Sequence, residues 1–239
     1  MIYVISTGMG DYLDLTGRAI KALNECEIIV GYKKYVGLIE KHFPNKKFIS
    51  YSMREEVARC EFVLKIAHDE NKNVGLISGG DAGIYGMAGL VLELSGKDDI
   101  IKIIPGLTSA TAAAALLGAP LSNDFAVISL SDLLTPQEVI LKRVKCSCNG
   151  DFVICFYNPG SERRRELFKQ ACSIIMEYRE KNTPAAIVTD ISREGQECKI
   201  LTISEIQNYE PKMNQTIIIG NSKTFNRNGK IITPRGYKI

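Results

Sequence analysis

The sequence predicts an α/β fold made of two domains, and two observations lead to this prediction. In the first half, short apolar runs alternate with amphipathic ones, which is the pattern of parallel strands joined by crossover helices. At residues 118–124 this periodicity stops and turn-forming residues gather in Gly-Ala-Pro-Leu-Ser-Asn-Asp, which indicates a domain boundary. We therefore expect an N-terminal α/β domain over residues 1–119 and a C-terminal α/β domain over residues 120–239.

The elements follow in order from this alternation. In the first half we expect strands at residues 2–6, 27–30, 47–49, 73–78 and 100–104, and helices at 16–26, 35–42, 54–68, 85–94 and 109–117. In the second half we expect strands at 125–129, 151–156, 185–188, 199–203 and 216–219, and helices at 136–144 and 163–181. Because the last strands follow one another without helices, the second sheet should be mixed. The tail from Asn226, with Asn-Gly and Thr-Pro-Arg-Gly, is expected to be a turn or a loose end.

The composition is that of an ordinary soluble globular protein. Of the 239 residues, 45% are hydrophobic and 24% are charged, so the chain can build proper cores without disulfide or metal crosslinks. A net charge of +3 is too mild to indicate a nucleic-acid partner. The first residues lack a basic leader, and no apolar run approaches the length of about 18 residues that a membrane span requires. We expect a cytoplasmic protein without a membrane partner.

The cysteines are scattered, and most fall in apolar segments, where a free cysteine behaves as a small hydrophobic residue. They are Cys26, Cys60, Cys146, Cys148, Cys155, Cys172 and Cys198. The only close pair is Cys146 and Cys148, and neither His42 nor His68 completes a metal-ligand spacing with it. Reduced thiols and no protein-bound metal are expected.

Three glycine-bearing turns follow predicted strands. Ligands of open α/β sheets bind at the carboxyl ends of strands, so the three turns are candidates for a single site. Residues 6–11 read Ser-Thr-Gly-Met-Gly-Asp, and Leu13 stands where a dinucleotide fingerprint would need its third glycine. Residues 78–86 contain four glycines and Asp81, and residues 105–109 read Pro-Gly-Leu-Thr-Ser before an alanine-rich helix. Glycines in such turns let a backbone approach a ligand closely.

Each turn also has a purely structural interpretation. The first turn can be a plain connection between a strand and a helix. Asp81 can accept hydrogen bonds from a ligand, or it can cap the helix that follows. Thr108 or Ser109 can contact a ligand, or it can cap a tightly packed helix.

Taken together, the turns resemble those of the tetrapyrrole methylases, the S-adenosylmethionine-dependent enzymes that methylate the corrin ring during cobalamin biosynthesis. The similarity runs nearly end to end and is greatest to the precorrin-3B and cobalt-factor III C(17)-methyltransferases. The segments that carry it are VGYKKYVGLI (30–39), YSMREEVARC (51–60), ISGGDAGIYGMAGLVLEL (77–94), PGLTSATAAAALLGAPLSNDFAVISLSDLLTP (105–136) and FYNPGSERR (156–164). The first turn departs from the family pattern Gly-x-Gly-Pro-Gly-Asp, because Ser6 replaces the first glycine and Met9 the proline.

The resemblance implies methyl transfer from S-adenosylmethionine to C-17 of precorrin-3B or cobalt-factor III, coupled to contraction of the ring. It also implies a homodimer of two-domain α/β chains with the cofactor in the cleft between the domains. Carried over position by position, the cofactor-binding residues would be Gly79, Gly80, Asp81, Ile84, Thr108, Ser109, Ala110, Tyr157, Asn158, Ala186 and Thr216.

The substrate implied by the resemblance carries acetate and propionate arms, which attract Arg and Lys. The candidates for these contacts, chosen by their proximity to predicted strand ends, are Lys33, Lys34, Arg54, Arg163, Arg164, Arg165 and Arg193. Ring contraction needs proton movements, and Asp11 is the candidate catalytic carboxylate. The alternative for Asp11 is a helix cap. Any cobalt would arrive inside the substrate.

Several alternatives share the cofactor turns. They are methylases of other ring carbons, diphthine synthases, ribosomal RNA ribose methylases and, in a different class, a non-catalytic nucleotide-binding module. The segments YSMREEVARC (51–60) and LSDLLTP (130–136) favour the C-17 enzymes. Methyl transfer from a sulfonium is an in-line displacement that needs no nucleophilic side chain, so the lack of a Ser-His-Asp or Cys-His arrangement is expected.

Overall fold

The computed structural model describes residues 1–70, 72–160 and 165–238. The chain divides into two compact units, Met1–Ser109 and Ala110–Ile239, which are described separately below. The domain limits of 1–119 and 120–239 remain a prediction. No helix within the described ranges combines the length and the apolar character that crossing a membrane requires.

The first unit is built on a parallel sheet of five strands with the order β3-β2-β4-β1-β5. Its strands are β1 (Ile2–Ser6), β2 (Ile28–Tyr32), β3 (Lys47–Tyr51), β4 (Val74–Ser78) and β5 (Ile101–Ile104). The strands of this sheet pair in parallel, with Ser6 opposite Ser78 at the carboxyl ends of β1 and β4. The predicted alternation of parallel strands and crossover helices is therefore confirmed.

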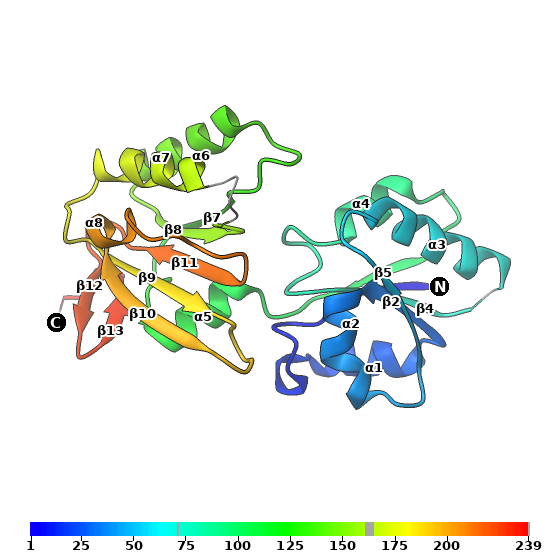
Figure 1. The fold of residues 1–239 in the computed structure, drawn as a ribbon. Coiled ribbons are helices and arrows are strands. Elements are labelled where there is room, and N and C mark those ends of the chain that lie inside the picture. The colour runs from blue at the N-terminus through cyan, green and yellow to red at the C-terminus, as the bar shows by residue number, and fades with distance from the viewer. Residues whose placement is uncertain (71, 161–164, 239) are drawn as a thin grey trace. The chain divides into compact units, whose positions relative to one another are not determined.

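Helices cover both faces of this sheet, as Figure 1 shows. They are α1 (Gly17–Glu25), α2 (Lys33–Ile39), α3 (Glu56–Asp69) and α4 (Ala88–Leu94), with short 3₁₀ helices at Tyr12–Asp14 and Glu40–His42. Leu23 and Ile39 pack into the core on one face. Val63 and Val91 pack into the core on the other. Because both faces are covered, the central strands β1, β2 and β4 are almost wholly buried and apolar, whereas the edge strands β3 and β5 are partly exposed and contain lysine.

Two helices of the first unit begin later than the sequence predicted. The expected starts were residues 54 and 85, whereas α3 begins at Glu56 and α4 at Ala88. Arg54 and Tyr85 have φ angles of 71° and 52°, in the left-handed region that a right-handed helix excludes. Both residues therefore belong to turns at the carboxyl edge of the sheet.

The second unit contains a mixed sheet with the order β10-β9-β11-β8-β7. Its strands are β7 (Phe125–Ser129), β8 (Val153–Tyr157), β9 (Pro184–Thr189), β10 (Glu197–Thr202) and β11 (Gln215–Ile219). Within the described part of this sheet, β7 and β8 pair in parallel, and the other pairs are antiparallel. The expectation of a mixed sheet is confirmed.

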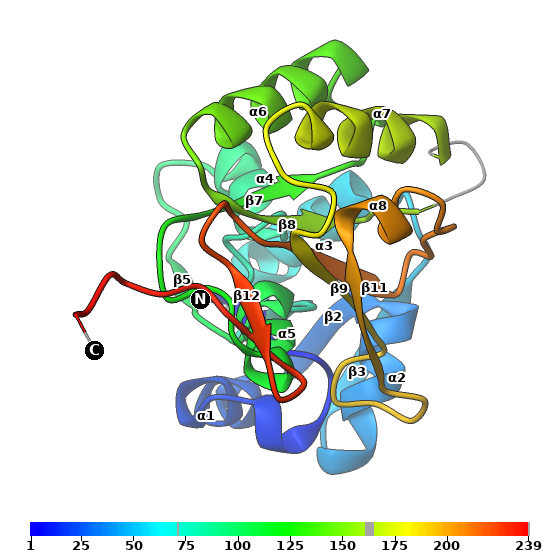
Figure 2. The same cartoon turned by 90° about the vertical axis from the view of Figure 1, so that its left-hand side faces the viewer.

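The helices of the second unit are α5 (Ser109–Leu117), α6 (Gln137–Asn149), α7 (Arg165–Met176) and α8 (Ile203–Ile206). Figure 2 shows α6 and α7 side by side over one face of the sheet, where Val144 and Phe168 join one apolar core. Helix α7 ends five residues before the predicted limit of 181. The sequence reasoning missed α8, a four-residue helix begun by a capping box of Thr202 and Glu205.

The tail forms a small sheet rather than a loose end over residues 225–232. Strands β12 (Phe225–Arg227) and β13 (Lys230–Ile232) are antiparallel, and β13 pairs in parallel with β6 (Gly118–Ala119). Asn228 and Gly229 have φ angles of 52° and 72°, as the tightest hairpin turns require. The expected Asn-Gly turn is confirmed, and β6 was missed because two residues carry no periodicity.

Candidate functional site

Hydrogen bonds join the three glycine-bearing turns at the carboxyl edge of the first sheet. The backbone N–H of Gly8 donates to the carbonyl oxygen of Gly80 at 3.1 Å, and the N–H of Gly80 donates back at 2.7 Å. The backbone N–H of Gly106 donates to Oδ2 of Asp81 at 2.8 Å. The structure therefore brings the first, second and third turns of the sequence together within one unit.

Ser6, the residue that departs from the family pattern, is fully buried between these turns. Its Oγ accepts a hydrogen bond from the backbone N–H of Ala82 at 2.8 Å. A Cβ placed on Gly106 would lie only 2.4 Å from the Cβ of Ser6. The serine thus fastens the second turn to the first, and the third turn can pass beside it only because residue 106 is glycine.

Asp81 crosslinks two turns through its carboxylate. Oδ1 accepts from the backbone N–H of Gly83 at 2.8 Å, while Oδ2 holds Gly106. Helix α4 begins only at Ala88, so Asp81 does not cap it, and the capping interpretation of this residue is wrong. Each carboxylate oxygen can accept a further hydrogen bond, so ligand donors could still bind here.

The backbone of Gly80 borders open space. Its φ angle is +70°, and a Cβ built on it would meet no atom within 4 Å. At Gly79 a Cβ would lie 2.5 Å from the Tyr35 ring, so that ring excludes any side chain. Ile84, four residues beyond Gly80, is 38% exposed. A narrow ligand group can therefore approach the main chain of this turn.

In the second unit, Tyr157 links the end of β8 to the start of α5. Its hydroxyl oxygen accepts from the backbone N–H of Ala110 at 2.7 Å. Asn158 has a φ angle of 51°, and its Nδ2 donates to Oγ of Ser129 at 3.0 Å. Ala110, Tyr157 and Asn158 are thus close together, and Thr108 and Ser109 directly precede Ala110 in the chain.

Ala186 and Thr216 lie within the second sheet. In the antiparallel register Thr216 is opposite Val188, and Ala186 is opposite Ile218, so both side chains point to the same face. That face is opposite to the one on which Ile187 joins the core under α6 and α7. Thr216 follows Gln215 at the Tyr157 end of β11, whereas Ala186 is fully buried in mid-strand.

Comparison with known proteins identifies the family of the chain. The family model Tetrapyrrole (Corrin/Porphyrin) Methylases matches residues 1–207. The chain belongs to the tetrapyrrole methylases.

Two relatives of the chain in this family carry the same description. The chain is 44% identical over 243 residues to a "probable cobalt-factor III C(17)-methyltransferase" of Salmonella typhimurium, with 100% of both chains covered. It is 43% identical over 247 residues to the protein so described from Methanocaldococcus jannaschii, covering 99% of this chain and 98% of the relative.

Two solved structures share the fold. The methyltransferase CobJ matches with a TM-score of 0.90 at 30% identity, covering 98% of this chain and 99% of CobJ. The uroporphyrin-III C-methyltransferase of Thermus thermophilus, solved in complex with S-adenosylhomocysteine, matches with a TM-score of 0.68 at 19% identity, covering 92% and 96% of the two chains. The predicted tetrapyrrole methylase fold is confirmed by the first of these.

Asp11 of this tetrapyrrole methylase caps the 3₁₀ helix Tyr12–Asp14. Its Oδ1 accepts from the backbone N–H of Leu13 at 2.8 Å, and the residue is exposed. The capping alternative weighed for Asp11 is thus present in the structure. A role in proton transfer remains a prediction.

The lysines and arginines that we expect to contact the substrate differ in exposure and in partners. Lys33, Lys34 and Arg54 are exposed, and Arg193 is half-buried. Arg165 forms an ion pair with Glu210 at 2.9 Å. Arg163 and Arg164 lie outside the described residues.

Sequence reasoning missed Arg59, which is buried in α3. Its side chain is 4% exposed, and its Nη2 lies 3.4 Å from the sulfur of Met87 and 3.8 Å from Oε1 of Glu56. The sequence did contain an indication that Arg59 is buried. Arg59 precedes Val63 by four residues, so the two lie on the same apolar face of the predicted helix.

The cysteines offer no metal or redox site in the part of the chain that the structure describes. No cluster of three His, Cys, Asp or Glu side chains there could hold a metal ion. Cys146 is exposed and Cys148 is buried, so the close pair in sequence faces two environments on α6. Burial raises the pKa of Cys155 and of Cys172 to about 12.

Proposed function

We propose that this chain transfers a methyl group from S-adenosylmethionine to C-17 of a tetrapyrrole of cobalamin biosynthesis, either cobalt-factor III or precorrin-3B, with contraction of the ring. The observation that carries the proposal is full-length identity of 44% to a relative described as a cobalt-factor III C(17)-methyltransferase. The hydrogen-bonded glycine turns of the first unit support a ligand role in this chain itself.

The first unit supplies features suited to the methyl donor. The open space beside Gly80 admits a narrow group to the backbone, with Gly79 and Ile84 as its neighbours. The carboxylate of Asp81 has acceptor capacity left for ligand hydroxyl or amino groups. The solved relative in complex with S-adenosylhomocysteine supports this choice of ligand.

The remaining cofactor candidates come from the second unit and from the last two residues of the first. At the carboxyl end of β8, Tyr157 accepts a hydrogen bond from Ala110, and the next residue, Asn158, donates to Ser129. Thr216 lies one residue beyond the pair of Ile217 and Phe156. The proposal assigns Ala186, Thr108 and Ser109 to the same ligand.

S-adenosylmethionine brings an electrophilic methyl group, so the protein has to align the two reactants and exclude water. Rigid turns suit this work, because their mutual hydrogen bonds hold Gly80 and Asp81 in place before a ligand binds. We assign proton movement during ring contraction to Asp11, which follows the first turn and is exposed.

The test is incubation of the protein with S-adenosylmethionine and either cobalt-factor III or precorrin-3B, followed by mass spectrometry of the product. We expect a gain of one methyl group on at least one substrate and release of S-adenosylhomocysteine. Binding of S-adenosylhomocysteine without turnover of either tetrapyrrole would instead support a methylase of another substrate or a non-catalytic module.

Asp81→Ala tests the donor site. We expect a loss of at least tenfold in affinity for S-adenosylhomocysteine by calorimetry. Asp98→Ala is the control, because Asp98 is an exposed aspartate of the same unit. Thermal melts show whether both variants are folded, and unchanged affinity in folded Asp81→Ala would contradict the site assignment.

A further inference from the structure

Arg59 is a buried cation without a full set of acceptors. Its side chain is 4% exposed, and Nε and Nη1 have no hydrogen-bond partner among residues 1–70, 72–160 and 165–238. A buried charge that lacks hydrogen bonds costs free energy, so its presence needs an explanation.

The position of Arg59 relates it to the glycine turns. It lies near the start of α3, which follows the carboxyl end of β3, on the edge of the sheet that carries those turns. Its neighbour Met87 ends the second turn, because the backbone N–H of Met87 donates to Oγ of Ser78 at 3.3 Å. The guanidinium therefore contacts the base of the turn that contains Gly79 and Gly80.

The two groups that face the guanidinium are poor partners for it. The Met87 sulfur, 3.4 Å from Nη2, is a weak acceptor on a flexible, unbranched side chain. Oε1 of Glu56 is 3.8 Å away and accepts instead from the backbone N–H of Arg54 at 3.3 Å. A guanidinium presents its donors as a planar fork that matches the two oxygens of a carboxylate.

We propose that Arg59 binds a carboxylate of a ligand held at the turn of residues 78–86, and that this carboxylate displaces the sulfur of Met87. This inference rests on the proposed function, which offers two sources of that group. One is an acetate or propionate arm of the tetrapyrrole, and the other is the amino-acid carboxylate of S-adenosylmethionine.

Arg59→Met is the main test, with Arg18→Met as the matched control, because Arg18 is an exposed arginine of the same unit. The readouts are KM and kcat for cobalt-factor III at saturating S-adenosylmethionine, calorimetric affinity for S-adenosylhomocysteine, and melting temperature. We expect Arg59→Met to keep or raise the melting temperature, because an apolar side chain replaces an unsatisfied charge, and to weaken binding of one ligand at least tenfold.

The two affinities identify the source of the carboxylate. A raised KM for the tetrapyrrole with unchanged S-adenosylhomocysteine affinity assigns Arg59 to a substrate arm, and the converse assigns it to the methyl donor. Unchanged values for both ligands in folded Arg59→Met would overturn the proposal.

If Arg59→Met does not fold, Arg59→Lys tests whether Arg59 binds a ligand carboxylate. Lysine keeps the charge and loses the bidentate fork, so we expect the same ligand to bind about three- to tenfold more weakly. An unchanged affinity for both ligands in this variant also overturns the proposal. A wild-type protein that binds neither ligand would refute the proposed function, whereas an active wild type with unaffected Arg59 variants refutes only the role of Arg59.

Discussion

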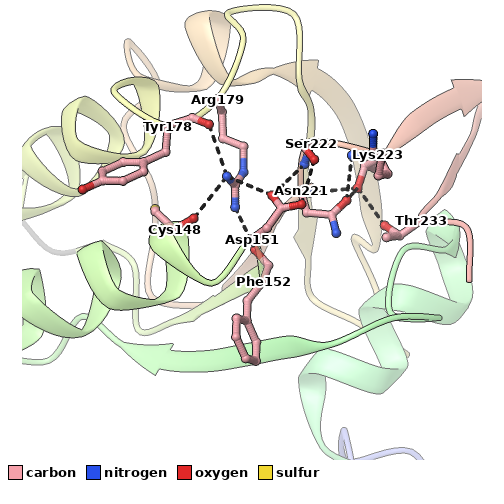
Figure 3. Close-up of polar contacts among 10 residues, drawn as sticks. Cys148, Asp151, Phe152, Tyr178, Arg179, Asn221, Ser222, Lys223 and Thr233 are labelled. Carbon is pink, nitrogen blue, oxygen red and sulfur yellow. Dashed lines mark hydrogen bonds and ion pairs between the residues drawn. The ribbon is translucent and has the colours of Figure 1, made fainter.

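Among the described residues, each unit of the molecule buries one arginine almost completely, and the two differ in their partners. Arg179 in the second unit has a side chain that is 3% exposed, close to the 4% of Arg59. Nη1 of Arg179 forms an ion pair with Oδ1 of Asp151 at 3.0 Å (Figure 3). The remaining contacts of its guanidinium are hydrogen bonds to the backbone carbonyl oxygens of Cys148, Phe152 and Tyr178.

The partners of Arg179 are held in turn by neighbouring segments. Asp151 accepts from the backbone N–H of Ser222 at 3.0 Å and from its Oγ at 2.7 Å. Oδ1 of the adjacent Asn221 accepts a hydrogen bond from Oγ1 of Thr224. The same Oγ1 lies 2.7 Å from Oγ1 of Thr233. Figure 3 shows these side chains as one network.

The comparison separates two uses of a buried charge. The Arg179 network lies where β8 begins, at the opposite end of the strand from Tyr157, and it fastens segments that are distant in sequence. Arg59 lies at the carboxyl edge of its sheet with few acceptors. Among the described residues, the guanidinium of Arg179 leaves only Nε without a hydrogen-bond partner, whereas that of Arg59 leaves both Nε and Nη1. A charge that is mostly paired in this way stabilises a fold, while one with few partners at a strand edge is available to a ligand.

The largest expected effect comes from Arg179→Met. It removes the ion pair with Asp151, which keeps its hydrogen bonds from Ser222, and the hydrogen bonds to three backbone carbonyl oxygens. The free energy of unfolding should therefore fall by about 2 kcal/mol. Urea unfolding measures this loss. A change below about 1 kcal/mol would mean that the network is not a stabilising element.

The rate at which a thiol reagent labels a neighbouring cysteine should report how each arginine affects the stability of its surroundings. Cys60 adjoins Arg59 in the chain, and the backbone carbonyl oxygen of Cys148 accepts a hydrogen bond from Nη1 of Arg179. Burial raises the pKa of both thiols to about 11. In Arg179→Met, Cys148 should react at least about tenfold faster with a thiol reagent at pH 8, because local opening becomes easier. Cys60 should keep its rate in Arg59→Met, and acceleration there would contradict the comparison.

Arg59→Met should change stability much less than Arg179→Met. We expect the free energy of unfolding to stay the same or to rise by about 1 kcal/mol, because the lost charge had few partners. Urea unfolding beside Arg179→Met provides the check. A loss as large as that of Arg179→Met would show that Arg59 is a structural residue.

Much of the fold follows from the sequence alone. Strand β1 has its predicted limits, and the three turns meet because each follows a strand of one parallel sheet. The elements that were missed are short, such as α8 with four residues and β6 with two, so they show no periodicity.

The contacts of the candidate site could not be predicted from the sequence, because they join residues that are distant in the chain. The bond between Asp81 and Gly106 spans 25 residues, and no local pattern predicts which backbone N–H a carboxylate will accept. Arg59 was missed because a charged residue is expected at the surface, even where helical spacing puts it in the apolar stripe. The late starts of α3 and α4 depend on left-handed residues, which only coordinates reveal.

Alkaline pH should destabilise both units gradually. Burial raises the pKa of Cys26, Cys155 and Cys172 from the usual 9.0 to about 12, so folding favours the neutral thiol. This contribution is complete below about pH 9 and is lost as the pH rises toward 12. Urea unfolding at pH 8 and pH 10.5 should show the fall. The fall should be smaller in Cys172→Ala than in the Cys198→Ala control, whose cysteine is exposed.

The contact between Ser6 and Gly106 also limits the order in which these residues could have changed. With serine at position 6, even a methyl group at position 106 would lie 2.4 Å from a neighbouring carbon. A glycine at position 6 would remove that clash and leave a tight contact of 3.0 Å with the carbonyl oxygen of Gly80. In an evolving lineage, glycine at position 106 therefore has to precede serine at position 6. Once the serine has gained its hydrogen bond to Ala82, reversal at position 106 is blocked.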